Sequence, residues 1–171
     1  METYIRDIPD FPKKGIVFKD ITPLLGNARA MEETVTRLVE PFTDAGVDLV
    51  AGIEARGFIF GALVARRLGA GFVPVRKPGK LPYKTIQASY DLEYGRDNVE
   101  MHVDAIAPGQ KVLLVDDLIA TGGTMQAACQ LVERLGGSIV GLAFVIELSF
   151  LHGRQRLAPH QVHSLINVEA E

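Results

Sequence analysis

"VLLVDDLIATGGT", residues 112–124, joins a short apolar run to two adjacent aspartates and to a Gly-Gly step flanked by threonines. The apolar run predicts a buried strand, so Asp116 and Asp117 are expected to lie where the chain leaves the core and to face a crevice. The two glycines allow the backbone to approach a ligand closely, and Thr121 and Thr124 add hydroxyl groups beside the unpaired amides of a following helix. These features predict a seat for a phosphate group, formed by a surface loop.

The chemistry of this loop narrows the choice of ligand. It has neither the lysine of a P-loop nor the glycine spacing of a dinucleotide-binding loop, which argues against ATP hydrolysis and NAD binding. Carboxylates such as Asp116 and Asp117 can accept hydrogen bonds from ribose hydroxyls, and a divalent metal can relieve repulsion between acidic groups and a polyphosphate. The whole stretch therefore predicts a ribose 5-phosphate seat. An isolated Asp-Asp or Gly-Gly step would indicate only an ordinary connection from strand to helix.

The chain on either side alternates apolar runs with helical patterns. We expect helices over residues 28–42, 57–69 and 124–135, and strands over residues 48–53, 72–75, 111–117 and 138–148. This alternation is typical of an α/β fold, in which helices cover both faces of a mostly parallel sheet. Ligands of such sheets collect at the carboxyl ends of the strands, where the two aspartates are expected.

Composition limits the class of protein. A chain of 171 residues is long enough for one well-buried core, and its net charge of -3 argues against a nucleic-acid partner. The longest apolar runs fall far short of the roughly 18 residues that cross a bilayer, and the charged N-terminus does not fit a secretory peptide. A lone cysteine, Cys129, fits a reducing cytosol and a core position. We therefore expect one cytoplasmic domain over residues 1–171, with no membrane span and no metal site among its four histidines.

Residues 112–124 resemble the phosphoribosyl diphosphate motif of type I phosphoribosyltransferases. Four other stretches, in the expected order, resemble the members of that family that act on adenine: FPKKGIVFKDITPLL, AGIEARGFIFG, PVRKPGKLP and ASYDLEYG. The resemblance covers nearly the whole chain. It implies a mostly parallel twisted sheet flanked by helices, a small N-terminal base-binding hood at about residues 1–27, and a flexible catalytic flap at about residues 76–103.

The resemblance also implies a reaction. Members of the family transfer 5-phosphoribosyl from its 1-diphosphate to adenine, which yields AMP and diphosphate. Mg²⁺ is the expected cofactor, and it is expected to bind through the substrate and water, with no protein side chain as a direct ligand. A homodimer is expected as well, because in relatives the basic residues of the flap segment reach the neighbouring subunit's site.

The resemblance assigns residues to each part of the substrates. The residues expected at the 5-phosphate and ribose are Asp116, Asp117, Ala120, Thr121, Gly122, Gly123 and Thr124. Those expected at the diphosphate are Glu54, Ala55, Arg56, Arg76, Lys77 and Lys80, with a cis peptide bond between Glu54 and Ala55. Those expected at adenine are Val17, Phe18 and Lys19. Phe18 would stack on the purine while the backbone of its two neighbours reads the Watson-Crick edge.

Two residues are expected to be catalytic. Glu93 would accept a proton from the base or hold it through N7, and Arg56 would stabilise the departing diphosphate. Each site residue also has a plainer interpretation: Phe18 as a core aromatic, Arg56 as a surface arginine at a helix start, the basic residues as a solvated loop, and Glu93 as a solvated hairpin glutamate.

Two other functions remain open from the sequence. One is a phosphoribosyltransferase for another purine base, which the N-terminal reading segment argues against. The other is a non-catalytic regulator of the same fold that senses nucleotides, which the presence of Glu93, the flap and Arg56 argues against.

Overall fold

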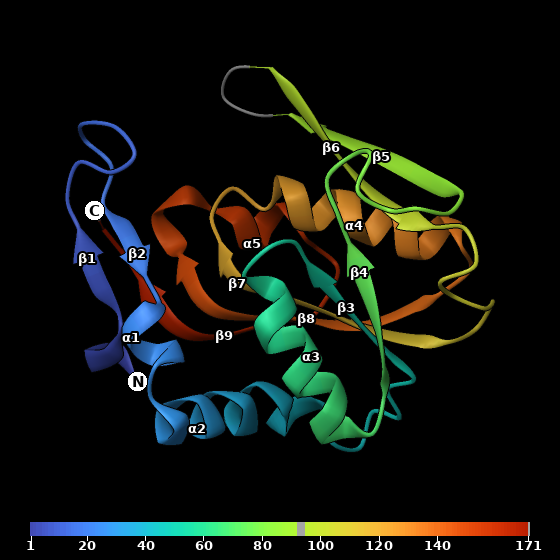
Figure 1. The fold of residues 1–171 in the computed structure, drawn as a ribbon, viewed down its shortest axis with the longest axis horizontal. Helices are drawn as coiled ribbons and strands as arrows, with labels where there is room; N and C mark the ends of the chain where they lie inside the picture. Colours follow the sequence, from blue (N-terminus) through green and yellow to red (C-terminus); the bar gives the residue numbers. More distant parts are fainter. Residues whose placement is uncertain (92–94, 171) are drawn as a thin grey trace.

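A parallel sheet forms the centre of the protein, whose computed structural model describes residues 1–91 and 95–170 (Figure 1). The sheet has five strands in the order β4-β3-β7-β8-β9, and every neighbouring pair is parallel. The strands are β3 (Leu49–Ile53), β4 (Gly71–Val75), β7 (Lys111–Ile119), β8 (Ser138–Leu148) and β9 (Val162–Val168). The predicted α/β fold with a mostly parallel sheet is confirmed.

Helices cover both faces of the sheet. They are α1 (Thr22–Leu25), α2 (Ala28–Val39), α3 (Gly57–Leu68), α4 (Gly123–Arg134) and α5 (Gly153–Arg156). Figure 1 shows α2 and α3 on one side of the sheet and α4 on the other. The 3-10 turns Glu2–Tyr4, Glu40–Phe42 and Ser149–Leu151 complete the helical segments.

The central strand β7 explains why the sequence reads as a continuous apolar run at this point. Val112 and Leu114 point into the core beneath α4, whereas Leu113 and Val115 point into the core beneath α2 and α3. All four side chains are fully buried. A strand covered on both faces needs apolar residues at every position, because successive side chains point to opposite faces.

Two small antiparallel sheets lie outside the central one. The strands β1 (Arg6–Ile8) and β2 (Phe18–Asp20) form the first and belong to the predicted hood. The strands β5 (Thr85–Asp91) and β6 (Arg96–His102) form the second, which is the hairpin expected in the flap segment. This β5-β6 hairpin lies over α4 (Figure 1).

The structure corrects one predicted boundary that matters for the site. Strand β7 was expected to end at Asp117 but continues to Ile119, because its pairing with β8 extends to the Ile119 and Glu147 pair. Asp116 and Asp117 therefore lie within the strand, beyond the last residue that pairs with β3. No helix within the described ranges is long and apolar enough to cross a bilayer.

Candidate active site

The connection between β7 and α4 forms a pocket of about 230 Å³. Its lining residues are Asp116, Leu118, Ile119, Ala120, Thr121, Gly122, Gly123, Thr124, Met125 and Phe144. Six of the seven residues predicted for the 5-phosphate and ribose are in this set, and Asp117 is not. Gly122 precedes α4 in a left-handed conformation with φ 79°. No side chain among the described residues caps the first amides of this helix, so they can bind an anion.

Gly123 is more enclosed than the sequence suggested. We expected a surface loop here, but Gly123 is buried where α4 begins against the β5-β6 hairpin. A Cβ atom at this position would lie 3.1 Å from Arg156 Nη1 and 3.4 Å from Tyr90 Cδ2. The expectation was wrong because the hairpin, distant in sequence, covers the loop.

Asp116 and Asp117 form a pair of acidic groups held largely away from water. Burial raises the pKa of Asp116 well above its usual range, and the charge of Asp117 raises it further. Burial also raises the pKa of Asp117, despite the opposing effect of Arg56. Arg56 Nη2 lies 2.8 Å from Asp117 Oδ2 as an ion pair without hydrogen-bond geometry, so this oxygen lacks a hydrogen-bond donor among the described residues. The pair is poorly suited to a further negative charge and well suited to a hydroxyl donor.

Arg56 connects this acidic pair to the predicted adenine segment. Its guanidinium Cζ lies 5.0 Å from the centre of the Phe18 ring, and Nη1 donates a hydrogen bond of 3.3 Å to the Lys19 carbonyl oxygen. Phe18 is only partly buried and belongs to neither hydrophobic core, so its interpretation as a core aromatic is wrong. Arg56 thus lies between the base-binding hood and β7.

The residues predicted for the diphosphate gather around Glu54. Arg76 Nη2 lies 3.0 Å from Glu54 Oε1, Lys80 Nζ lies 2.8 Å from the same oxygen, and the Lys77 amide donates to Oε2 at 3.1 Å. These hydrogen bonds, above all that of Arg76, lower the pKa of Glu54 to about 2. The peptide bond between Glu54 and Ala55 is cis, as expected.

The Lys77 side chain is directed elsewhere. Its Nζ donates to the Tyr90 hydroxyl at 2.6 Å and pairs with the Asp97 carboxylate. The contact joins the segment after β4 to both strands of the hairpin. Neither Tyr90 nor Asp97 was predicted as a site residue, although Tyr90 belongs to ASYDLEYG, one of the stretches that resemble the family.

Comparison with known proteins identifies the family. The phosphoribosyl transferase domain matches residues 24–165. An adenine phosphoribosyltransferase from Nitrosococcus oceani is 58% identical over 167 residues, which cover 98% of this chain and 98% of that protein. This chain belongs to the adenine phosphoribosyltransferase family.

Solved structures of other adenine phosphoribosyltransferases share the fold over nearly the full length. The enzyme from Rhodothermus marinus has a TM-score of 0.94 and 55% identity, and the match covers 98% of this chain and 96% of that one. The enzyme from Saccharomyces cerevisiae, solved with adenine and an imino-altritol bisphosphate, has a TM-score of 0.91 and 42% identity, with 96% and 95% covered.

Glu93 lies outside the described residues, so its role stays a prediction. Within residues 1–91 and 95–170, no group of three histidine, cysteine, aspartate or glutamate side chains could hold a metal ion. Cys129 is buried in α4, as expected, and burial raises the pKa of its thiol to about 12.

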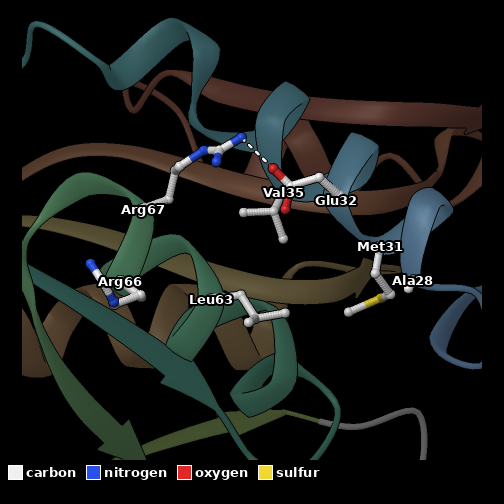
Figure 2. Close-up of a pocket in the computed structure, with 7 residues that line it drawn as sticks. All are labelled: Ala28, Met31, Glu32, Val35, Leu63, Arg66 and Arg67. Atoms are coloured by element: carbon white, nitrogen blue, oxygen red, sulfur yellow. Dashed lines mark ion pairs between the residues drawn. The ribbon is translucent and has the colours of Figure 1, made fainter.

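A larger pocket of about 560 Å³ lies away from the strand ends, between α2 and α3 (Figure 2). It is lined by Ala28, Met31, Glu32, Val35, Leu63, Arg66 and Arg67, and none of these is a predicted site residue. Figure 2 shows Glu32 and Arg67 facing each other across its edge, where they form an ion pair of 2.7 Å. The smaller pocket at β7 and α4, rather than this one, has the groups that suit a sugar phosphate.

Proposed function

We propose that the pocket between β7 and α4 is the ribose 5-phosphate seat of an adenine phosphoribosyltransferase. The enzyme acts in purine salvage, where it transfers 5-phosphoribosyl from 5-phosphoribosyl 1-diphosphate to adenine and releases AMP and diphosphate. The observation that carries the assignment is the convergence of six predicted residues on one pocket at the carboxyl end of the central strand.

Each end of the sugar phosphate meets a different part of the chain in this proposal. The backbone amides of residues 121–123 and the hydroxyls of Thr121 and Thr124 hold the 5-phosphate at the start of α4. Asp116 lines the pocket and accepts hydrogen bonds from the ribose hydroxyls. Asp117 does not line the pocket and instead orients Arg56 through their ion pair.

Adenine is proposed to lie against Phe18 in the hood. A backbone carbonyl of Val17 or Lys19 would accept a hydrogen bond from the 6-amino group, and a backbone amide would donate to N1. The enzyme from Saccharomyces cerevisiae was solved with adenine, which supports adenine as the base.

The diphosphate is proposed to leave toward Arg76 and Lys80. These two side chains would then exchange their contact with Glu54 for one with the more highly charged diphosphate.

Adenine is expected to react faster than hypoxanthine by about 30-fold or more. Hypoxanthine presents the opposite hydrogen-bond polarity at both positions of its Watson-Crick edge, and each mismatched buried group costs about 1 to 3 kcal/mol. The test measures kcat/KM for adenine, hypoxanthine, guanine and xanthine with 5-phosphoribosyl 1-diphosphate. Preference for another base would refute the assignment of Val17, Phe18 and Lys19 to adenine recognition. Binding of 5-phosphoribosyl 1-diphosphate without AMP formation would instead favour the alternative function, a non-catalytic regulator that senses nucleotides.

Mg²⁺ is proposed as the cofactor, bound through the diphosphate and water. When bound, it neutralises charge between the diphosphate and the acidic pair, whose raised pKa values reflect an environment unfavourable to added negative charge. We expect excess chelator to lower the rate of AMP formation by at least about tenfold, and added Mg²⁺ to restore it. Full activity in excess chelator would show that the reaction does not require Mg²⁺.

A cytoplasmic location stays a prediction.

A homodimer is proposed as the working form of the enzyme. The surface of α3 supports a dimer, because Ile59 and Leu63, four residues apart on this helix, are 38% and 41% exposed, and Leu63 lines the larger pocket. Sedimentation equilibrium should give twice the chain mass of 18.6 kDa. The Leu63→Glu variant should shift the protein toward the single-chain mass, and a wild-type monomer would contradict the proposal.

A further inference from the structure

The first residue of the short helix α5, Gly153, meets the phosphate-binding loop, residues 120–123, backbone to backbone. A Cβ atom at Gly153 would lie 2.1 Å from the Ala120 carbonyl oxygen and 3.0 Å from the Gly122 nitrogen. In the other direction, a Cβ atom at Gly122 would lie 2.7 Å from the Gly153 carbonyl oxygen. Carbon and oxygen atoms normally stay about 3.3 to 3.6 Å apart even in close contacts. Neither glycine can therefore gain a methyl group unless the loop or α5 moves by about 1 Å.

An ion pair between the buried Glu147 and the half-exposed Arg154 holds α5 in this position. Arg154 Nε donates to Glu147 Oε1 at 3.0 Å, and a second guanidinium nitrogen, Nη2, donates to Oε2. Arg154 Nη1 also donates to the Val162 carbonyl oxygen at 2.6 Å, and the Ser164 hydroxyl donates to Glu147 Oε2 at 2.6 Å. A two-pronged contact of this kind fixes the orientation of the arginine as well as its distance.

The position of Glu147 connects this ion pair to the phosphate-binding loop. Glu147 belongs to β8 and pairs in register with Ile119, the last residue of β7 before the loop. Only 6% of Glu147 is exposed. Burial acts to raise its pKa, but hydrogen bonds from Arg154 and Ser164 outweigh that effect and leave the pKa below its usual range. Glu147 is therefore charged at neutral pH, and its partner Arg154 directly follows Gly153.

The far end of α5 is anchored separately. Leu157, the residue that ends the helix, is 2% exposed and packs in the core beneath α4. The helix is therefore held at both ends, with its first residue pressed against the loop. The proposed mechanism assigns no role to any of these residues.

We propose that Gly153, fixed by the Glu147 and Arg154 ion pair, is a positioning residue that holds the phosphate-binding loop in the shape that accepts the 5-phosphate. The proposal rests on the assignment of that loop to the 5-phosphate. Backbone amides must be aimed at the phosphate oxygens to within about 0.5 Å. Gly153 does not line the pocket, but its backbone meets the loop at Ala120 and Gly122 and so limits displacement of the loop. The absence of a side chain at position 153 is what allows the two backbones to meet.

The first test is the Gly153→Ala variant, with binding measured by calorimetry. We expect its affinity for ribose 5-phosphate to fall by about tenfold or more, the effect of losing one charge-assisted hydrogen bond. Its affinity for diphosphate, which is assigned to the loop around Glu54, should stay within about twofold of wild type. The matched control is Gly26→Ala. Gly26 has an ordinary helical φ of -75°, and a Cβ atom there would lie 3.4 Å from its nearest neighbour.

The Arg154→Lys variant provides the second measurement. It keeps the charge and most of the volume but loses the two-pronged contact, so it should weaken ribose 5-phosphate binding while diphosphate binding stays within about twofold. This variant decides the question if Gly153→Ala does not fold. Equal losses for both ligands, or unchanged ribose 5-phosphate affinity in a folded Gly153→Ala protein, would overturn the positioning role. If wild type fails to bind ribose 5-phosphate in competition with AMP, the loop assignment itself is wrong, which is a separate result.

Discussion

Gly123→Val is expected to lower the affinity for 5-phosphoribosyl 1-diphosphate and for AMP by about 10²-fold or more. The Cβ atom of the valine would lie 3.1 Å from Arg156 Nη1. This nitrogen is at the end of a flexible side chain that can move. The two further methyl groups of valine extend toward Tyr90 and the Asp91 carbonyl oxygen, which lie 3.4 and 3.6 Å from the Cβ position. Because the β5-β6 hairpin packs against α4 and resists displacement, the valine side chain would push the phosphate-binding loop, residues 120–123, out of position. Loss of two amide contacts to the phosphate, at about 1.5 to 3 kcal/mol each, accounts for the factor.

Two further variants separate this effect from damage to the fold. Gly123→Ala displaces only Arg156 and should lose less affinity than the valine variant. Thr121→Val removes a hydroxyl at an exposed position without repacking, and it should weaken AMP binding by about tenfold. Circular dichroism and thermal unfolding would establish that each variant folds, and calorimetry would give the AMP affinity. A folded Gly123→Val protein that binds AMP normally would refute the phosphate seat.

Glu93→Gln is expected to lower kcat by roughly 10²-fold or more with little change in KM. Attack of adenine N9 on the ribosyl carbon requires loss of a ring proton, and a carboxylate near the base can accept that proton or hold it through N7. Glutamine keeps the size and hydrogen bonding of glutamate but removes its basicity. The effect should therefore fall on the chemical step after both substrates have bound.

The control for this prediction is another acidic residue, Asp91. Asp91 is an exposed acid at the end of β5 that pairs across the hairpin with Arg96. Asp91→Asn removes the same charge at a position with no proposed contact to the base, so its kcat should stay within about twofold of wild type. Equal losses in the two variants would point to the net charge of the hairpin. A near-normal kcat in Glu93→Gln would indicate a solvated glutamate and leave catalysis to positioning and to stabilisation of the departing diphosphate.

Local patterns in the sequence were sufficient for the elements that build the sheet. Strand β8 begins and ends where its apolar run does, and α2 and α3 follow the predicted spacing of apolar residues closely. The phosphate-binding loop was also predictable, because the amides and glycines that suit an anion are neighbours in the chain. Strand β9 was not predicted, since polar residues such as His163, Ser164 and Asn167 interrupt its apolar pattern. Helix α5 is a single turn, too short for a periodic signal.

The tertiary structure decided which of these groups meet. Arg56 reaches Asp117 and the Lys19 carbonyl oxygen because β3 lies beside β7 and the hood lies close to both. Gly123 is buried because the β5-β6 hairpin covers α4, and Gly153 meets the phosphate-binding loop because β8 carries Glu147 beside the end of β7. Propensity and periodicity act over a few neighbouring residues, whereas these contacts depend on the order of strands in the sheet. That order is set by the packing of the whole chain, so the sequence by itself determined the elements and the phosphate loop, and only the fold determined what surrounds that loop.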